Sequence, residues 1–313
     1  MDRRPRPRIV VPLASTQARI WPPLPVRTAP ITATTASDGH LPGAGKWLFC
    51  KLYGHPDRHT ALLTTHLPEL LSTLDKPVRW WFLPYRDPDN HLRLRIQLAT
   101  PDCFGTVAVH LGAWVARLRQ HGLIATMQLD TYLPETGRFG HGTVMAAAEE
   151  VFAADSAAAL AQRAHLAAGP DAADVWALTA ASLVDLAAAF SGDYTTGNAW
   201  LIDHITTGPV PAPDRAVYDQ ALHLADPRDD LATVRGLASG EQIAAAWAAR
   251  RTALAAYRAA LARAGTPAPD SVLASLLHLH SVRTSGIAPE IERISHRLAR
   301  AAALSQTHPK GRR

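Results

Sequence analysis

The stretch from Trp80 to Leu98 constrains the fold most, because it reads as two β-strands around a tight turn. Residues 87–90, Asp-Pro-Asp-Asn, predict the turn, since proline presets φ and Asp and Asn bond their own backbone. The second strand contains HLRLR, so His91, Arg93 and Arg95 would share one face. Its apolar residues would point into a core: Leu92, Leu94 and Ile96. Three cationic or cationisable groups in a row predict an anion-binding face.

The order of predicted elements in residues 45–142 is strand, helix, two strands, helix, strand. This order is typical of a split βαβ, ferredoxin-like unit. Two helices are expected between the strands, one from Asp57 to Leu74 and one from Asp102 to His121. The first and last strands would be KWLFCKLYG and ATMQLDTYL, on either side of the predicted hairpin.

Residues 143–304 are predicted to be mostly helical and to pack on the ferredoxin-like unit as one domain, which makes the fold class α+β. Apolar residues recur there at three- and four-residue spacing, and alanine is abundant. We expect residues 1–44 to form an irregular, basic, Pro-rich arm and residues 305–313 a basic tail. The expected helices are 143–167, 171–190, 213–225, 239–264, 269–283 and 288–304.

Composition points to a cytoplasmic protein with a core of ordinary size. The chain has 313 residues, of which 47% are hydrophobic, and no apolar run is long enough for a signal peptide or a membrane span. Cys50 and Cys103 are the two cysteines, which predicts buried thiols and no disulfide framework or zinc site. Much of the net charge of +5 lies at the two ends, so charge alone does not indicate a nucleic-acid partner.

Three segments concentrate polar groups beside apolar flanks: residues 84–95, 130–142 and 276–286. Arg138 lies between Gly137 and Gly140, in a loop that could approach a ligand or could simply join a strand to a helix. On a helix, His278 and His280 would face different directions, which disfavours a metal pair. Guanidinium groups bind carboxylates and histidine exchanges a proton near neutrality. This chemistry suits a departing carboxylate, an enolate or a carboxylate that is merely bound.

Taken together, these segments resemble the thiopeptide-type bacteriocin biosynthesis domain, which is also the C-terminal elimination domain of lantibiotic dehydratases. Six short motifs stand in the order and spacing of that family. They are KLYG at 51–54, YRDP at 85–88, HLRLR at 91–95, DTYLPE and RFG within 130–140, AEEVFAADS at 148–156 and HLHSVR at 278–283.

The resemblance implies a stand-alone small subunit with a lyase activity. A partner, the glutamylating large subunit, would use glutamyl-tRNA to glutamylate Ser or Thr of a ribosomal precursor peptide. This chain would then eliminate glutamate to leave dehydroalanine or dehydrobutyrine, without a metal or organic cofactor and without contacting membrane or nucleic acid itself. The two arginines and the histidine of the family's elimination site map onto Arg95, Arg138 and His280.

Further substrate-binding candidates lie beside these three residues. For Arg93, a supporting salt bridge is the simpler interpretation. The complete set of second candidates is His91, Arg93, Tyr132, Glu135, His278 and Arg283.

Departures from the family pattern keep other functions open. Pro84, His141 and the triplet Ser281-Val282-Arg283 stand where the family commonly has Arg, Gly and His-Asn-Arg. The same family includes thiopeptide pyridine synthases, which join two dehydroalanines by a formal [4+2] cycloaddition. Elimination is favoured because both arginines and the histidine are retained. A third hypothesis is a non-catalytic subunit that binds the precursor peptide along an exposed sheet edge.

Overall fold

The computed structural model describes residues 39–74, 79–169, 172–206 and 213–307. These residues belong to one compact unit, Thr34–Arg313. The predicted arm and tail fall largely outside the described residues. Within the described part of the arm, His40 forms an antiparallel β-bridge with Tyr132.

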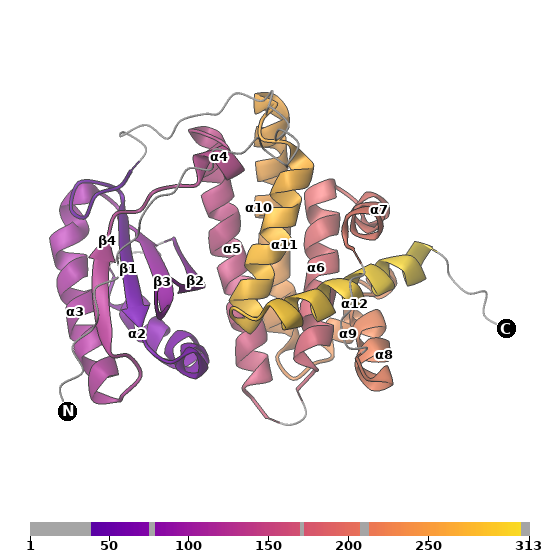
Figure 1. Cartoon of the computed structure of the whole chain (residues 1–313), viewed down its shortest axis with the longest axis horizontal. Coiled ribbons are helices and arrows are strands. Elements are labelled where there is room, and N and C mark those ends of the chain that lie inside the picture. Colours follow the sequence, from indigo (N-terminus) through magenta and orange to yellow (C-terminus); the bar gives the residue numbers. More distant parts are fainter. Residues whose placement is uncertain (1–38, 75–78, 170–171, 207–212, 308–313) are drawn as a thin grey trace, which may run out of the picture. The chain divides into compact units, whose positions relative to one another are not determined.

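The first half of the described chain contains the predicted ferredoxin-like sheet. Four antiparallel strands lie in the order β2-β3-β1-β4, as Figure 1 shows. Helical segments connect β1 to β2 and β3 to β4, and a tight hairpin connects β2 to β3. The strands are β1 (Trp47–Tyr53), β2 (Trp80–Arg86), β3 (Asn90–Gln97) and β4 (Thr126–Asp130).

Both connecting segments pack on one face of the sheet. Leu92, Leu94 and Ile96 of β3 are buried there, as their alternation predicted. The second connection is η4 (Pro101–Cys103) followed by α3 (Phe104–Gln120). The first is η2 (Pro56–Arg58), α1 (His59–Ala61), the π-helical η3 (Leu62–His66) and α2 (Leu67–Ser72).

The first connection differs from the single helix expected over residues 57–74. Pro68 stands in the first turn of α2. Proline has no N–H to donate and its ring displaces the carbonyl four residues earlier, so regular α-helical bonding is interrupted there. A π-helical turn immediately before α2 accommodates the interruption.

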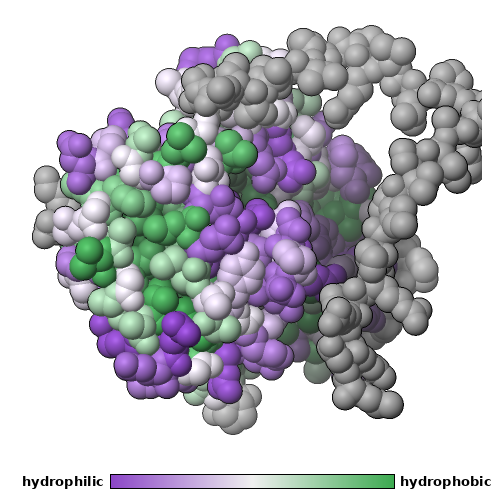
Figure 2. Space-filling model, turned by 60° about the vertical axis from the view of Figure 1, so that its left-hand side comes forward, coloured by the Kyte–Doolittle hydropathy of each residue, from purple (hydrophilic) through white to green (hydrophobic). Residues whose placement is uncertain are grey.

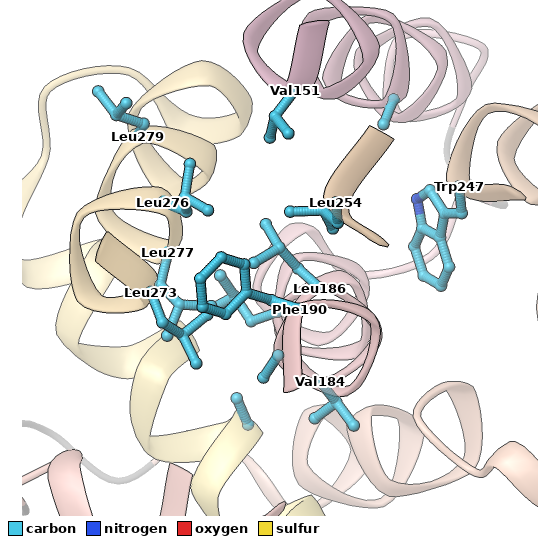
Figure 3. Packing of buried hydrophobic residues seen from close by; sticks show 14 of the residues in the cluster. Val151, Val184, Leu186, Phe190, Trp247, Leu254, Leu273, Leu276, Leu277 and Leu279 are labelled. Carbon is cyan, nitrogen blue, oxygen red and sulfur yellow. The ribbon is translucent and has the colours of Figure 1, made fainter. Parts of the chain in front are cut away.

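The second half is helical, as predicted, and its principal helices enclose a second core. Figure 3 shows Val151 of α5, Leu186 of α6, Leu254 of α10 and Leu276 of α11 pointing toward one another. The alanines let these helices approach closely. The elements are α4 (Thr136–Phe139), α5 (Thr143–Leu166), α6 (Val175–Ser191), α7 (Tyr194–His204), α8 (Arg215–Leu224), η5 (Pro227–Asp229), α9 (Ala232–Arg235), α10 (Gly240–Ala264), α11 (Pro269–Ser285) and α12 (Pro289–Thr307).

One long helix of the second half was not predicted. Helix α7 has few apolar residues, and Leu201 is its one fully buried large side chain, so the helical periodicity is weak. Its start is nevertheless encoded locally, because the Asp193 carboxylate accepts a hydrogen bond from the N–H of Thr196 at 2.8 Å. No single helix within the described residues is long and apolar enough to span a membrane, and α6 and α7 pass that test only as a pair bent by 115°.

The helical half covers the middle of one sheet edge. In β2, the N–H of Phe82 donates to Ser156 Oγ of α5 at 3.2 Å. The carbonyl of Phe82 accepts from Arg283 Nε of α11 at 3.1 Å. These bonds occupy backbone groups at the centre of this edge, which therefore offers poor access to an added strand; β4 is the other edge. The face seen in Figure 2, on the α3 side, carries a hydrophobic patch, and Val109 of α3 is exposed.

Candidate functional site

Strand β3 presents its three basic side chains on the sheet face opposite α2 and α3. Its register sets Arg95 between Phe49 of β1 and Trp81 of β2. Both of these aromatic residues belong to the core of the helical half. The sequence-predicted basic face is therefore turned toward the helices that follow the sheet in the chain.

Arg95 is a buried cation surrounded by aromatic rings. Its Cζ lies 3.9 Å from the ring centroid of Trp81, 4.2 Å from that of Phe49 and 4.9 Å from that of Tyr132. The residue is 6% exposed, and its Nε and Nη1 have no hydrogen-bond partner among the described residues. Burial lowers the pKa of Arg95 to about 9, so the group stays charged at neutral pH. A buried cation without a carboxylate partner is costly, and an anion would relieve that cost.

Tyr132 forms one wall beside Arg95. Its ring makes edge contacts with Trp47 and Trp81, and its hydroxyl donates to Glu149 Oε1 at 2.8 Å. Burial and the Glu149 carboxylate raise the pKa of Tyr132, which keeps the phenol protonated. Tyr132 therefore shapes the site and does not suit the role of a base at neutral pH.

The loop after β4 brings a second arginine to the site. Arg138 of α4 pairs with Glu135, with 3.1 Å between Nη1 and Oε2, and both side chains are largely exposed. The hydroxyl of Tyr257 donates to the carbonyl of Phe139 at 2.8 Å, which attaches α4 to α10. The predicted ligand-facing loop is thus held to the helical half at its C-terminal end.

Of the two glycines near Arg138, Gly137 and Gly140, only Gly140 has a backbone conformation that favours glycine. It has a φ of +95°, and a Cβ there would lie 2.4 Å from Val144 Cγ1. We expect Gly140→Ala to lower the free energy of unfolding by about 1–3 kcal/mol, because it adds both backbone strain and a clash. Gly137→Ala is the matched control, since a Cβ there meets nothing within 4 Å. Equal denaturation midpoints for the two variants would contradict this account.

His278 of α11 lies near the same loop. Its Nδ1 is 2.7 Å from Glu292 Oε1 of α12. The hydrogen bond with Glu292 raises the pKa of His278, with a smaller contribution in the same direction from Glu135, while burial and Arg138 oppose it. Glu135 also acts on the pKa of Arg95. Its carboxylate therefore lies within electrostatic range of both groups as well as in contact with Arg138. We call Arg95, Tyr132, Glu135, Arg138 and His278 the Glu135 cluster.

His280, which the resemblance assigned to elimination, lies in a separate buried network. It is 0% exposed, and its Nδ1 is 2.7 Å from Asp155 Oδ1 of α5. Asp155 also pairs with Arg283 at 2.7 Å and with Arg250 of α10 at 3.0 Å. Burial lowers the pKa of His280, and the Asp155 carboxylate opposes that effect.

This buried network ties the sheet to the helical half. Arg283 bonds both Asp155 and the Phe82 carbonyl of β2, and Arg250 bonds Asp185 of α6 at 3.0 Å. Nε and Nη1 of Arg283 are engaged in these structural contacts, whereas its buried Nη2 has no hydrogen-bond partner among the described residues. Its substrate-binding role stays a prediction. Sequence reasoning missed Arg250 because the adjacent arginines 250 and 251 in an alanine-rich helix resemble solvated residues.

The remaining second candidates line the sheet face. The Arg93 guanidinium stacks on Tyr85, with Cζ 3.3 Å from the ring centroid, and its Nε is 3.4 Å from His91 Nε2. Among the described residues no carboxylate lies within ion-pair distance of Arg93, and Lys51 pairs with Asp130, whose pKa Arg93 also helps to lower. His91 is buried, and its Nδ1 is 2.9 Å from the carbonyl of Asp89 in the hairpin turn. That contact gives His91 a structural role.

The described residues offer no group of three or more His, Cys, Asp or Glu side chains suited to a metal ion. What they offer is an exposed guanidinium paired with Glu135, and a buried guanidinium and a carboxylate-bonded imidazole within electrostatic range of the same Glu135 carboxylate. This set can bind an anionic group and move a proton beside it.

Comparison with known proteins agrees with the motifs. A family model described as lantibiotic biosynthesis dehydratase C-term matches residues 47–303. The chain is 33% identical over 150 residues to the subtilin biosynthesis protein SpaB of Bacillus subtilis, which covers 47% of this chain and 14% of that protein. It is 30% identical over 112 residues to the nisin biosynthesis protein NisB of Lactococcus lactis subsp. lactis, which covers 36% of this chain and 11% of that protein.

Two solved structures resemble this fold. The tRNA-dependent lantibiotic dehydratase MibB from Microbispora sp. 107891 superposes with a TM-score of 0.73 at 26% identity, over 86% of this chain and 29% of that chain. The pyridine synthase TbtD from thiomuracin biosynthesis superposes with a TM-score of 0.55 at 14% identity, over 83% of this chain and 98% of that chain. The chain therefore spans a small part of the dehydratase-type proteins and nearly the full length of the pyridine synthase.

Proposed function

Because the chain belongs to the family of lantibiotic dehydratase C-terminal domains, we propose that it is a lyase that eliminates glutamate from glutamylated Ser or Thr of a ribosomal precursor peptide. The products would be dehydroalanine and dehydrobutyrine. A glutamylating large subunit, with glutamyl-tRNA as donor, would carry out the preceding step.

The observation that carries this proposal is the unpaired guanidinium of Arg95 inside its aromatic surround. Elimination breaks the bond between Cβ of the modified residue and the ester oxygen, and releases the glutamyl carboxylate. A carboxylate is a good leaving group, with a conjugate-acid pKa of about 4, once a cation meets its developing charge. Arg95 would supply that cation in a site of low polarity, where the interaction is strong.

Arg138 would release Glu135 and bind the carboxylate of the substrate's glutamyl group in its place. Its guanidinium is held by Glu135 in an exposed ion pair, which costs little to open. A glutamyl group carries a carboxylate of the same chemistry as Glu135 and can compete for the same donor. Arg95 and Arg138 would then hold the glutamyl group between them.

We assign proton transfer to His278, in place of the His280 of the sequence analysis. The base removes the Cα proton of the modified residue, and the electron pair left behind forms the Cα=Cβ bond as the carboxylate departs. With Nδ1–H donating to Glu292, the unprotonated Nε2 of His278 would be the basic atom. His280 would act indirectly, because the network around it fixes α11 against β2.

Arg95→Met tests the leaving-group role. Elimination of glutamate from a pre-glutamylated peptide, followed by mass spectrometry, is expected to slow by on the order of 10²–10³. The melting temperature should stay the same or rise, because methionine fills the aromatic surround without an unpaired charge. Arg119→Met, an exposed position on α3, is the control. A rate close to that of the unmodified protein would refute the role of Arg95.

Glu292→Gln tests the coupling between His278 and its carboxylate partner. Because Glu292 raises the pKa of His278, its removal should let that pKa fall. The base must be unprotonated to act, so the acidic limb of the pH profile of kcat/KM should move to lower pH, with a lower plateau. If the acidic limb of the kcat/KM profile stays at the same pH in Glu292→Gln, His278 is not the base that titrates.

A cycloaddition of the pyridine-synthase type remains the second candidate, because this chain covers 98% of TbtD in length. Mass spectrometry separates the two functions. Elimination removes glutamate from an adduct, whereas a synthase acts on a peptide that is already dehydrated and releases a leader fragment. Conversion of a dehydrated peptide, with no loss of glutamate from the adduct, would replace the elimination proposal. If neither reaction occurred while the peptide bound, the chain would be the binding subunit of the third hypothesis.

A further inference from the structure

A second basic site lies at the other end of β3 from Arg95. A pocket of about 390 Å³ is bounded by the start of β3, the end of β2, the first residues of α1 and the ends of α5 and α11. We call this the Arg163 pocket. Six polar residues of its lining carry the argument below. They are His59, Thr60, Arg86, Asn90, Arg163 and Ser285. It shares no lining residue with the Glu135 cluster.

Arg163, in the last turn of α5, is the most buried cation of this pocket at 8% exposure. Its Nε donates to the carbonyl of Arg283 at 2.6 Å, and its Nη1 donates to Thr60 Oγ1 at 2.9 Å. No carboxylate among the described residues forms an ion pair with it. The carbonyl end of α11 supplies partial negative charge, which is less than a full counter-charge. Burial lowers the pKa of Arg163 to about 10, so it remains a cation.

His59 adds an unsatisfied polar group to the same wall. It is 5% exposed, and its buried Nε2 has no hydrogen-bond partner among the described residues. Burial first, and then the positive charge of Arg163, lower the pKa of His59 to about 4. The His59 imidazole is therefore neutral at pH 7, as expected for a histidine beside the Arg163 cation in a region of positive potential.

The rest of the wall is rich in donors. The Arg86 guanidinium, the Asn90 amide and the Ser285 hydroxyl also line the pocket. Asp57 is the one carboxylate among its described lining residues; its side chain is exposed and lies 3.3 Å from His55. Two arginines and one carboxylate thus line the pocket, and the balance of formal charge is positive.

We propose that the Arg163 pocket binds the carboxylate of a small ligand, separately from the elimination site. Planar guanidinium groups bind carboxylates through paired donors, and the volume is that of an ordinary small-ligand site. The carboxylate could belong to a free amino acid or to an acidic side chain of a peptide. This inference goes beyond elimination and does not depend on the roles given to Arg95, Arg138 and His278.

Isothermal titration calorimetry of the whole protein at constant ionic strength tests the proposal. The probes are sodium glutamate, a short peptide with one aspartate and blocked ends, and inorganic phosphate. We expect saturable binding of glutamate or of the peptide, weakened at least tenfold by Arg86→Ala and abolished by Arg163→Met. Binding of glutamate but not of the peptide would identify the free amino acid as the source, and the opposite result an acidic side chain.

Two controls keep the test decisive. Arg58→Ala removes an exposed arginine of η2 that does not line the pocket, and Arg138→Ala alters only the Glu135 cluster. Arg58→Ala should retain the full affinity of the unmodified protein. Arg138→Ala should remove only glutamate that binds at the Glu135 cluster, and should leave the binding that Arg86→Ala weakens. If Arg163→Met does not fold, Arg86→Ala and Asn90→Ala carry the test. The proposal is overturned if neither carboxylate binds saturably, if phosphate binds in their place, or if Arg138→Ala removes the binding while Arg86→Ala leaves it.

Discussion

Replacing His278 with glutamine is expected to slow glutamate elimination by about 10²–10⁴-fold, the usual contribution of a general base. The side chain is about half exposed and bonds Glu292 at the surface, so the fold should tolerate the change. Single-turnover assays on a pre-glutamylated peptide measure the rate, and thermal denaturation measures stability. His223→Gln, at an exposed position of α8, is the matched control and should retain full activity.

His280→Asn distinguishes His278 from its neighbour two residues away. Because His280 is wholly buried against Asp155, the substitution should lower the melting temperature. The protein that remains folded should still eliminate glutamate. A normal rate for His278→Gln, together with loss of activity in folded His280→Asn, would return the base to His280.

Strand periodicity predicted which face of the sheet carries Arg95. Helix periodicity did not decide between His278 and His280. Alternation in β3 fixes the face of Arg95 because successive side chains of a strand point to opposite sides. On α11, spacing shows that His278 and His280 diverge, but it does not show which of them faces the loop after β4. That choice depends on how α11 packs on α5 and β2, through Asp155 and Phe82, which are distant in sequence.

The aromatic residues around Arg95 could not be predicted from the sequence either. Phe49 belongs to β1, Trp81 to β2 and Tyr132 to the segment after β4. The register of β1, β2 and β3 brings the first two beside the arginine. Each of these residues reads as ordinary core when taken alone. The ferredoxin-like order was predictable because each strand and turn carries a local signal, whereas α7 was missed because its one fully buried large side chain, Leu201, gives almost no periodicity.

Asp155→Asn is expected to lower the free energy of unfolding by about 3–5 kcal/mol, because it leaves buried cations without their charge partner. Asp155 is 2% exposed and bonds Arg250, Arg283 and His280 together. Asparagine keeps the shape and removes the charge, so packing changes little. Urea denaturation gives the difference. Asp219→Ala is the control, since its exposed pair with Arg215 should contribute about 0–1 kcal/mol.

The pH dependence of stability gives an independent check on Asp155. Although burial acts to raise the pKa of Asp155, His280, Arg283 and Arg250 together hold it well below its ordinary value. A depressed carboxylate pKa stabilises the native state above the unfolded-state pKa of about 3.9, and this contribution is lost as pH falls below that value toward the native pKa. The unmodified protein should therefore lose stability in acid more steeply than Asp155→Asn. Parallel acid profiles would show that the Asp155 carboxylate does not hold α5, α10 and α11 together.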